Sequence, residues 1–319
     1  MPPLLGVSLG DPNGIGLEIT LKAFRTVRAE KPDLRLCCIG DRNLVKTEAE
    51  KQGMDCPEVL DPGVPFPRAN YGQTTAEAGI ASSAWVTTGI DACLNQELDA
   101  LITAPINKHA WDLAGVDMPG HTELLGARCG TDRFGMMLMG KGLRVFLATR
   151  HLPLASVPEV LSEKDIRLAV ELVSEALPFM GIDQPRIAVC GLNPHAGDGG
   201  TLGTEERDWI EPLLNKMQAE GFGCSGPHPA DTVFHQALHG HYDAVIALYH
   251  DQGLGPLKLL AFDEGVNVTL GLPIIRTSPD HGTAFGIAGK GIARADSMHH
   301  AILAAADLTQ RHNPWTRPR

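Results

Sequence analysis

The feature that most constrains the fold is a repeated alternation of short apolar runs with longer amphipathic segments along the 319 residues. The apolar runs have the length of strands and end in polar or glycine-rich loops, and the longer segments have the periodicity of helices. Such alternation predicts an α/β protein with a mostly parallel sheet. In sheets of this kind ligands bind at the carboxyl ends of the strands, where the polar loops lie.

The pattern places individual elements along the chain. Strands are expected at residues 4–9, 34–39, 99–104, 134–139, 142–149, 186–190, 244–248, 266–270 and 273–277. Helices are expected at residues 16–28, 43–52, 74–95, 162–180, 204–220 and 296–311. Residues 74–77 resemble a capping box, and residues 140–142 are typical of a hairpin turn. Residues 57–71, rich in proline and glycine, are expected to be irregular.

Composition excludes several classes of protein. The formal net charge is -11 and no cluster of lysine and arginine occurs, which argues against a nucleic-acid partner. No apolar run is long enough to span a bilayer, and the N-terminal residues lack the pattern of a signal peptide. The 7 cysteines contain no C-x-x-C pair, so we expect buried, reduced thiols in a cytoplasmic protein.

Three histidines share one kind of position. His151, His195 and His250 each follow the end of an expected strand. Adjacent parallel strands would bring them together, and three imidazoles with open positions suit a divalent metal that holds substrate oxygens. For any one of them, an ordinary loop histidine is the simpler explanation. His250 is followed by Asp251, a second ligand or an orienting partner, and then by an expected glycine turn.

Basic and polar residues further along the chain are candidates for anion binding. Lys258 and Arg276 lie in apolar surroundings, and basic side chains are seldom buried without a partner. Asn267 lies between them in the sequence. The alternative for the two cations is a structural salt bridge to one of three carboxylates, Asp251, Asp263 or Asp280.

Two shorter segments leave alternatives open. His121 and Thr122 are either a polar substrate contact or the start of a helix, and Asp231 is either a helix N-cap or an acid near the metal. Residues 10–16 follow a strand and precede a helix, but their spacing is not that of a dinucleotide or P-loop motif. They form either a tight turn without a ligand or a backbone cradle for an anion or a substrate. His235, His239 and His241 are expected to be a solvated surface group.

The chain resembles the 4-hydroxythreonine-4-phosphate dehydrogenase family in a series of motifs that occur in the family's order. They are residues 10–18 (GDPNGIGLE), 103–108 (TAPINK), 120–123 (GHTE), 191–197 (GLNPHAG), 229–232 (PADT), 249–254 (YHDQGL), 265–267 (GVN), 275–278 (IRTS) and 280–284 (DHGTA). The matches span nearly the whole chain.

The resemblance implies an oxidoreductase of vitamin B6 biosynthesis. It would oxidise 4-hydroxy-L-threonine 4-phosphate with NAD or NADP, and the product would lose carbon dioxide to give 3-amino-2-oxopropyl phosphate. It also implies a divalent metal (zinc, magnesium, manganese or cobalt) and a phosphorylated hydroxy acid as substrate. The implied metal ligands are His151, His195 and His250, and the implied substrate contacts are His121, Thr122, Lys258, Asn267 and Arg276. For proton transfer we expect Lys258, Asp251 or Asp231, in that order.

The resemblance further implies a fold like that of isocitrate and isopropylmalate dehydrogenases, with two α/β domains and a cleft. We place the first domain at residues 1–120 with 265–319, and the second, which carries the metal ligands, at residues 121–264. The family's metal site is shared between the subunits of a homodimer. No nucleic acid or membrane partner is expected.

Two departures from the family pattern stand out. The region between residues 52 and 75 is short, and Arg150 separates Thr149 from His151, where it either adds a charge near the metal or points to solvent. Within the family, D-threonate and D-erythronate 4-phosphates are alternative substrates, whereas dihydrodiol dicarboxylates are disfavoured by the intact residues 120–123 and Arg276. From other classes, the alternatives are a metal-dependent phosphoester hydrolase and a non-catalytic binding protein.

Overall fold

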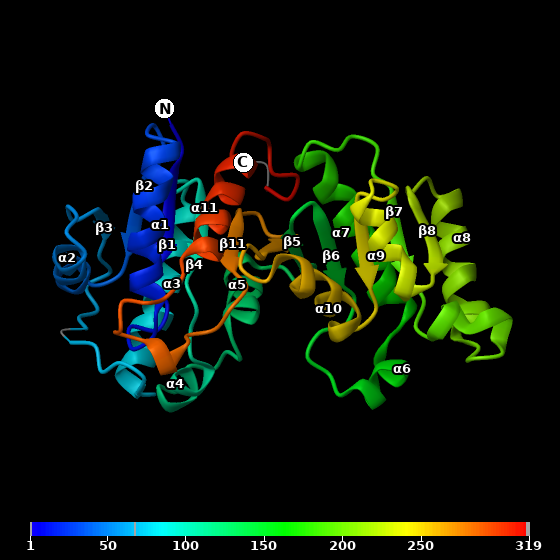
Figure 1. Cartoon of the computed structure of the whole chain (residues 1–319), viewed down its shortest axis with the longest axis horizontal. Coiled ribbons are helices and arrows are strands. Elements are labelled where there is room, and N and C mark those ends of the chain that lie inside the picture. The colour runs from blue at the N-terminus through cyan, green and yellow to red at the C-terminus, as the bar shows by residue number, and fades with distance from the viewer. Residues whose placement is uncertain (1, 67, 317–319) are drawn as a thin grey trace. The chain divides into compact units, whose positions relative to one another are not determined.

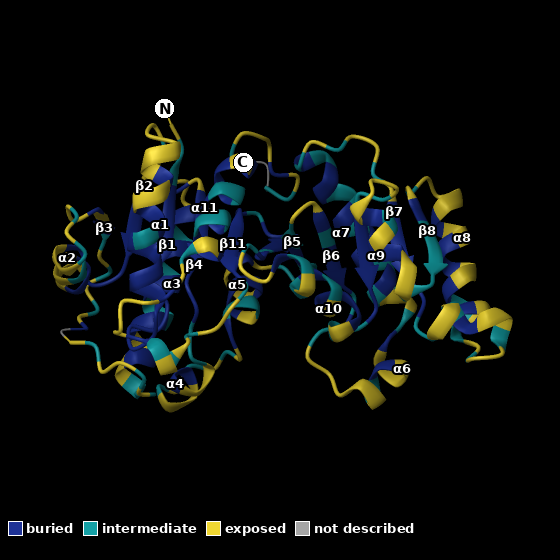
Figure 2. Ribbon diagram, viewed as in Figure 1, coloured by how far each residue is buried: buried dark blue, intermediate teal, exposed yellow. Residues whose placement is uncertain are grey.

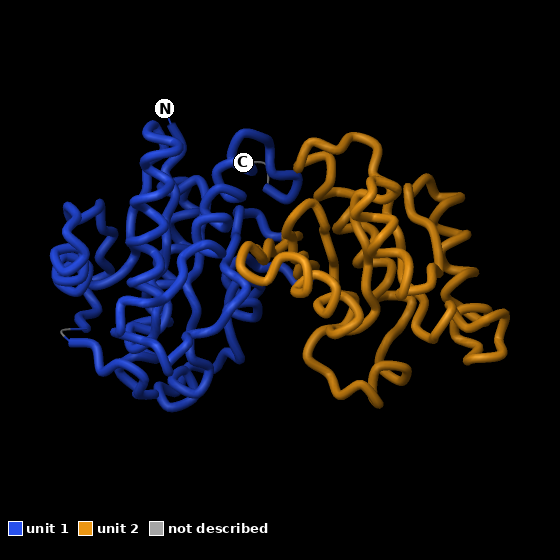
Figure 3. The backbone as a smooth tube through the Cα atoms, in the orientation of Figure 1, with its two compact units in different colours: residues 1–132, 272–319 blue, residues 133–271 orange. Residues whose placement is uncertain are grey.

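The computed structural model describes residues 2–66 and 68–316 and divides into two compact units (Figure 3). The first unit comprises residues 1–132 and 272–319, and the second comprises residues 133–271. In each unit parallel strands are covered by helices on both faces (Figure 1).

In the first unit all strand pairs are parallel, in the order β3-β2-β1-β4-β11. The strands are β1 (Leu4–Ser8), β2 (Arg35–Ile39), β3 (Glu58–Leu60), β4 (Ala100–Thr103) and β11 (Arg276–Pro279). The helices are α1 (Gly16–Glu30), α2 (Arg42–Lys51), α3 (Ala76–Leu94), α4 (Lys108–Leu113), α5 (His121–Cys129) and α11 (Asp296–Leu308). Helices α1 and α11 pack on each other over one face of this sheet (Figure 1). Helix α3 covers the other face and packs against α4 and α5.

In the second unit the strand order is β10-β5-β6-β9-β7-β8. The first two pairs are antiparallel and the other three are parallel. The strands are β5 (Gly135–Gly140), β6 (Leu143–Leu147), β7 (Ile187–Cys190), β8 (Cys224–His228), β9 (Ala244–Ala247) and β10 (Val266–Leu270). The helices are α6 (Val157–Val160), α7 (Glu163–Phe179), α8 (Glu211–Ala219, after a π-helix at Glu206–Ile210), α9 (Ala230–Leu238) and α10 (His250–Ala261). Helices α9 and α10 contact the sheet on one face and α7 on the other (Figure 1).

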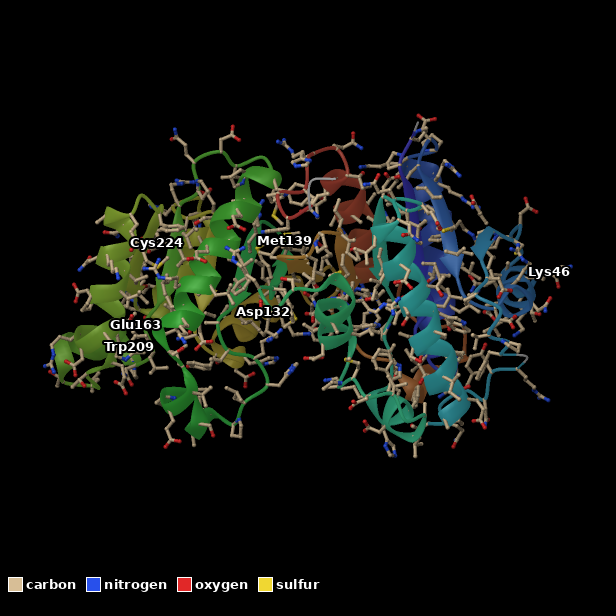
Figure 4. All side chains as sticks on the ribbon, turned by 180° about the vertical axis from the view of Figure 1, so that it is seen from behind. Lys46, Asp132, Met139, Glu163, Trp209 and Cys224 are labelled. Atoms are coloured by element: carbon tan, nitrogen blue, oxygen red, sulfur yellow. The ribbon has the colours of Figure 1, made fainter. Side chains whose placement is uncertain are left out.

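The core of each unit is formed by its central strands, which are buried on both faces (Figure 2). Parallel strands covered by helices on both sides need continuous apolar runs, and β7 and β9 have them, with every residue buried. Helix α7 begins at a capping box between Ser162 and Asp165, close to the expected helix start at residue 162, and Figure 4 labels its first residue, Glu163. The expected hairpin is confirmed as β5 and β6, joined at Lys141 and Gly142, which both have positive φ.

Each expected strand and helix has a counterpart in the structure, and the expected α/β class with mostly parallel strands is confirmed. Several elements were not predicted: β3, β8, α4, α6 and α10. Helix α5 begins at His121, where the start of a helix was one of two alternatives. Strand β3 lies in the segment expected to be irregular, so that expectation is wrong for Glu58–Leu60. Strand β8 contains a glycine and a proline, which sequence rules exclude from central strands but which an edge strand tolerates.

Two local predictions are wrong. Thr75, not Thr74, caps α3, because the hydroxyl of Thr74 accepts a hydrogen bond from Asn107 instead. The turn expected at Gly253 is part of helix α10, which begins at His250. Gly253 is needed there for close packing, since a Cβ would come within 2.7 Å of a side-chain carbon of Val145.

The boundaries of the compact units differ from the expected domain boundaries. The units divide at 132/133 and 271/272, whereas the sequence suggested 120/121 and 264/265. Helix α5 packs on α3, and β10 is hydrogen-bonded to β5, so each lies in a different unit from the domain expected for it. His121 and Thr122 therefore lie in the first unit, and Asn267 lies in the second.

Two further properties concern the described residues as a whole. None of their helices is long and apolar enough to cross a membrane. All the cysteines are free, and all except the exposed Cys56 are buried, in agreement with the expected reduced thiols.

Candidate functional site

The strands that precede the three candidate histidines are neighbours in the second unit. Strand β9 pairs in parallel with β6 on one side and with β7 on the other. Leu147 is in register with Ala247, and Val189 with Ile246, so the three strands end at the same edge. The expected adjacency of the strand ends is therefore confirmed.

Two buried side chains tie these strand ends together. The amide of Gln252 accepts a hydrogen bond from Leu248 N at 2.7 Å and donates one to Gly191 O at 2.7 Å. The hydroxyl of Thr149 donates to Leu248 O at 2.6 Å. Leu248 precedes His250, Gly191 precedes His195 and Thr149 precedes His151, so one chain of hydrogen bonds links all three loops.

His151 and His250 lie side by side beyond these strand ends. Their ring centroids are 5.5 Å apart, and both line a cavity of about 290 Å³. Nδ1 of His250 is 2.7 Å from a carboxylate oxygen of Asp251. Because an ionised carboxylate only accepts, it favours the neutral tautomer of His250 that is protonated at Nδ1, in which Nε2 keeps its lone pair. The carboxylate therefore leaves His250 Nε2 available as a metal ligand.

Arg150 lines the same cavity, and its guanidinium carbon lies 6.0 Å from the ring centroid of Phe134. This is the distance of a cation–π contact. The charge of Arg150 is thus held against an aromatic ring at the edge of the cavity and does not simply point to solvent.

His195 lies in a loop with an unusual backbone. Residues 195–199 have φ between +44° and +80°, and three of them, His195, Ala196 and Asp198, carry a Cβ. The left-handed region costs about 1–2 kcal/mol for each such residue. Nδ1 of His195 is 4.0 Å from a carboxylate oxygen of Asp231 in the first turn of α9, so Asp231 is not the N-cap of that helix.

Imidazole nitrogens are suitable ligands for a divalent metal. Of the three histidines, His151 and His250 also lie close enough together to share one. Within a single copy of residues 2–66 and 68–316, however, no group of three metal-ligating side chains converges. The structure brings together His151 and His250 but does not add His195 to them.

Lys258 and Asn267 belong to the second unit but not to the histidine pair. Lys258 lies eight residues after His250 on helix α10, which corresponds to about 12 Å along the helix axis. Its ammonium is 5.7 Å from the ring centroid of Phe262. Asn267 lies on β10, and its buried Oδ1 accepts no hydrogen bond from the described residues. A buried acceptor without a partner among the described residues suits a ligand that donates a hydrogen bond.

In the first unit, Arg276 and His121 form a second group of predicted residues. Arg276 is buried on β11, and its guanidinium donates to the hydroxyl of Thr103 at 2.6 Å from Nη2 and 3.2 Å from Nε. Burial lowers the pKa of Arg276 to about 10. Burial, with the positive charges of Arg276 and Lys108, lowers the pKa of His121 well below its usual value. His121 is therefore neutral at physiological pH.

Other contacts of His121 complete this group. The Trp111 ring meets the His121 ring edge-on at 5.8 Å, and Nε2 of His121 is buried without a hydrogen-bond partner among the described residues. Helix α5 begins at His121, so Thr122 lies in its first turn, where backbone N–H groups are unsatisfied. A Cβ on Gly120 would come within 3.2 Å of Lys108 Cε, which places the lysine beside the same helix end. Cationic groups at a helix N-terminus suit an anion.

The glycine-rich segment at residues 10–16 is a tightly bonded turn. Gly10 has a φ of 67°, and a Cβ there would come within 2.2 Å of Pro105 O, so only glycine fits. Asn13 is bonded to Asn70, Gly72 and Gln73 through its side chain and carbonyl. Through these hydrogen bonds the segment forms a tight turn that is joined to residues 70–73 of the first unit.

Sequence reasoning overlooked three residues of these sites. Lys108 is part of the 103–108 motif, and a basic residue just after a strand end was a usable signal. Gln252 likewise lies in a quoted motif, but its role depends on which strands are neighbours. Glu206, which accepts hydrogen bonds from Asn193 two residues before His195, lies in the segment expected to be the 204–220 helix, and no sequence pattern marks its buried carboxylate.

Known proteins of this fold define the class of the chain. A 4-hydroxythreonine-4-phosphate dehydrogenase of Klebsiella pneumoniae, solved by crystallography, has a TM-score of 0.87 and 36% identity, covering 98% of this chain and 99% of that chain. A 4-hydroxythreonine-4-phosphate dehydrogenase of Ruegeria sp. (strain TM1040) is 46% identical over 98% of this chain and 99% of its own length. The corresponding protein of Desulfosudis oleivorans is 43% identical over 96% of each. The chain is an oxidoreductase.

Within that class, residues 17–305 match the family model described as pyridoxal phosphate biosynthetic protein PdxA. The chain belongs to this family. The resemblance found in the sequence motifs is therefore confirmed over nearly the whole length of the protein.

Proposed function

We propose that the protein oxidises 4-hydroxy-L-threonine 4-phosphate at C3 with NAD or NADP, in vitamin B6 biosynthesis. Decarboxylation of the product would then yield 3-amino-2-oxopropyl phosphate. The observation that carries this proposal is the near full-length similarity to 4-hydroxythreonine-4-phosphate dehydrogenases, at 46% identity for the Ruegeria protein. A cytoplasmic location stays a prediction of the sequence.

His151, His195 and His250 would hold the divalent metal, for which zinc, magnesium, manganese and cobalt are the candidates. When bound, the metal supplies Lewis-acid polarisation of the substrate's alcohol and charge stabilisation during decarboxylation. Asp251 would hold the His250 ring in the tautomer that ligates, through the 2.7 Å contact at Nδ1. Asp231 would contribute only a negative charge beside His195, because its 4.0 Å distance from Nδ1 is beyond that of a hydrogen bond.

The anionic ends of the substrate call for cationic contacts. In the first unit Arg276, Lys108 and neutral His121 would provide charge-assisted and neutral hydrogen bonds to a phosphate or carboxylate, with Thr122 beside them. In the second unit Lys258 and Asn267 are the proposed contacts. The buried Nε2 of His121 and Oδ1 of Asn267, each without a partner among the described residues, support this assignment.

Proton transfer from the C3 alcohol needs a base near the histidines. Lys258, Asp251 and Asp231 remain the proposed candidates. Of these, Asp251 lies closest to the paired histidines, whereas Lys258 is about two helical turns away along α10. Within one copy of the chain, this geometry favours Asp251 over Lys258.

We further propose that the active form is a homodimer in which a second copy supplies His195 to the His151–His250 pair. The proposal is supported by the convergence of only two of the three histidines within one copy. Leu259 on α10 and Phe262 immediately after it are 91% and 72% exposed, which marks this helix as a candidate for self-association.

A substrate panel tests the proposed function. The purified protein would be given 4-hydroxy-L-threonine, D-threonate and D-erythronate 4-phosphates with NAD or NADP, and each of the four metals. We expect the fastest cofactor reduction with 4-hydroxy-L-threonine 4-phosphate. Faster reduction with a threonate or erythronate phosphate would reassign the substrate. Release of inorganic phosphate without cofactor reduction would indicate a hydrolase, and binding without either reaction a non-catalytic protein.

A further inference from the structure

The left-handed turn at residues 195–199, called the His195 turn below, is unusual because it is continuous. Its five residues all have positive φ, whereas left-handed residues normally occur singly. A turn of this length must be held by groups outside it, because its non-glycine residues prefer other backbone regions.

The carboxylate that holds the His195 turn belongs to Glu206. This side chain is 3% exposed, and it accepts hydrogen bonds from Asn193 N at 2.6 Å and from Asn193 Nδ2 at 2.9 Å. It also lies against the backbone on both sides of His195. A Cβ on Gly191 would come within 3.2 Å of Glu206 Oε1, and one on Gly197 within 2.7 Å of Glu206 Oε2.

Glu206 is presented by an uncommon element, the π-helix Glu206–Ile210, in which Figure 4 labels Trp209. Such helices occur frequently at functional sites. The preceding residue, Glu205, accepts a hydrogen bond from the same Asn193 amide at 2.8 Å, but from a more exposed position. The two glutamates thus share one partner and differ in burial.

The site requires a carboxylate specifically. Both partners of Glu206 are donors, a backbone N–H and a side-chain NH₂, so both oxygens must accept. Glutamine in this place would turn its own NH₂ towards one of the two donors. A buried donor without an acceptor is costly, so the backbone at Asn193 would move.

We propose that Glu206 is a positioning residue for His195. Its buried carboxylate keeps the His195 turn left-handed and thereby sets the direction in which the imidazole meets a divalent cation. Glu206 acts through Asn193 and does not itself touch the cation. The inference rests on the proposed role of His195 as a metal ligand.

The test is the affinity of the whole chain for Co²⁺ and Zn²⁺, measured by competition with a chromogenic chelator. Four proteins are compared: wild type, His195→Ala, Glu206→Gln and the double variant. Glu206→Gln should weaken binding by roughly 10–100-fold, the usual effect of losing a group that orients a ligand. The double variant should bind no more weakly than His195→Ala alone, because Glu206 acts through that histidine.

Glu205→Gln is the matched control, since it changes the same charge and contacts the same amide. It should leave the affinity close to that of the wild type. The absorption spectrum of the Co²⁺-loaded protein gives a second readout, and it should change in Glu206→Gln but not in Glu205→Gln.

Two outcomes separate this inference from the proposed function. If His195→Ala binds metal as tightly as the wild type, the proposed metal site is wrong, and the role of Glu206 is wrong with it. If His195→Ala binds weakly but Glu206→Gln binds normally, the inference alone is overturned. An additional loss in the double variant also overturns it, because it would show a general structural effect.

Should Glu206→Gln fail to fold, Asn193→Ala replaces it in the same comparison. At this half-buried position alanine removes the side-chain donor to Glu206, keeps the backbone N–H and leaves the carboxylate in place. The expected result is again a weakened affinity that is not additive with His195→Ala. A normal affinity in folded Asn193→Ala would contradict the proposal.

Discussion

The buried carboxyl group of Asp11 should make the stability of the protein depend on pH. Its side chain is fully buried in the turn at residues 10–16, one oxygen accepts from Asn13 N, and the other has no hydrogen-bond partner within the described structure. Burial raises the pKa of Asp11 from 3.8 to about 6. The folded state therefore keeps a proton that the unfolded chain loses near pH 4.

Stability should consequently fall as the pH rises from about 4 to about 6, with the loss complete above the folded-state pKa. Asp11→Asn should remove this dependence and raise the free energy of unfolding at pH 7 by up to about 3 kcal/mol. Urea unfolding of both proteins at pH 4 and pH 7 measures the difference.

Asp41 is the control for Asp11. It is also buried, but its two oxygens accept hydrogen bonds from Leu44 N and Phe66 N. An asparagine there would set its NH₂ against a donor, so Asp41→Asn should destabilise the protein. An equal gain from both substitutions would contradict the explanation given for Asp11.

Ala196 tests the cost of the left-handed turn. It has φ 52° and ψ 44°, a region that glycine adopts without strain. Ala196→Gly should therefore raise the free energy of unfolding by about 1 kcal/mol. Ala84→Gly, inside α3, should lower it by a similar amount, because glycine is unfavourable within a helix. A destabilised Ala196→Gly protein would show that the backbone there is not strained.

Among the elements, the link that the side chain of Gln252 makes between the ends of β7 and β9 can be tested by a single substitution. Gln252→Met would leave Leu248 N and Gly191 O without their side-chain partner in a buried place. We expect a loss of about 2 kcal/mol in unfolding free energy, together with weaker metal binding. The exposed Gln218 makes one comparable bond, to Cys224 O at 2.8 Å. Gln218→Met should cost less stability and leave metal binding unchanged, and equal metal affinity in both variants would contradict the role of Gln252.

The sequence predicts the elements better than it predicts their contacts. Continuous apolar runs indicate β6, β7 and β9, and a histidine after each strand end indicates where a site lies. Helix α10 was missed because Gly253 and Gly255 are typical of turns, and only the packing of Gly253 on β6 explains the first of them. Likewise, nothing in the sequence around Glu206 shows that its carboxylate is buried beneath the His195 turn.

For the whole molecule, the proposed sharing of a metal site between two copies can be tested with mixed dimers. If His151 and His250 come from one copy and His195 from the other, mixed dimers of His195→Ala and His250→Ala chains contain one intact site. Activity should therefore return when these two inactive proteins are unfolded and refolded together.

Mixing His151→Ala with His250→Ala is the matched control. Both residues belong to the same copy's pair, so no mixed dimer of these two proteins has an intact site. Activity in the control mixture, or none in the first mixture despite mixed dimers in native mass spectrometry, would contradict the assignment of His195 to the second copy.

We propose above that the protein is a metal-dependent dehydrogenase for 4-hydroxy-L-threonine 4-phosphate. The most direct test follows formation of reduced nicotinamide and of carbon dioxide with this substrate, before and after removal of metal by a chelator. We predict equal amounts of the two products, loss of both after chelation, and recovery when a divalent metal is restored. Full turnover by the metal-free protein would show that the reaction does not depend on a metal, and no cofactor reduction under any of these conditions would show that the proposed activity is wrong.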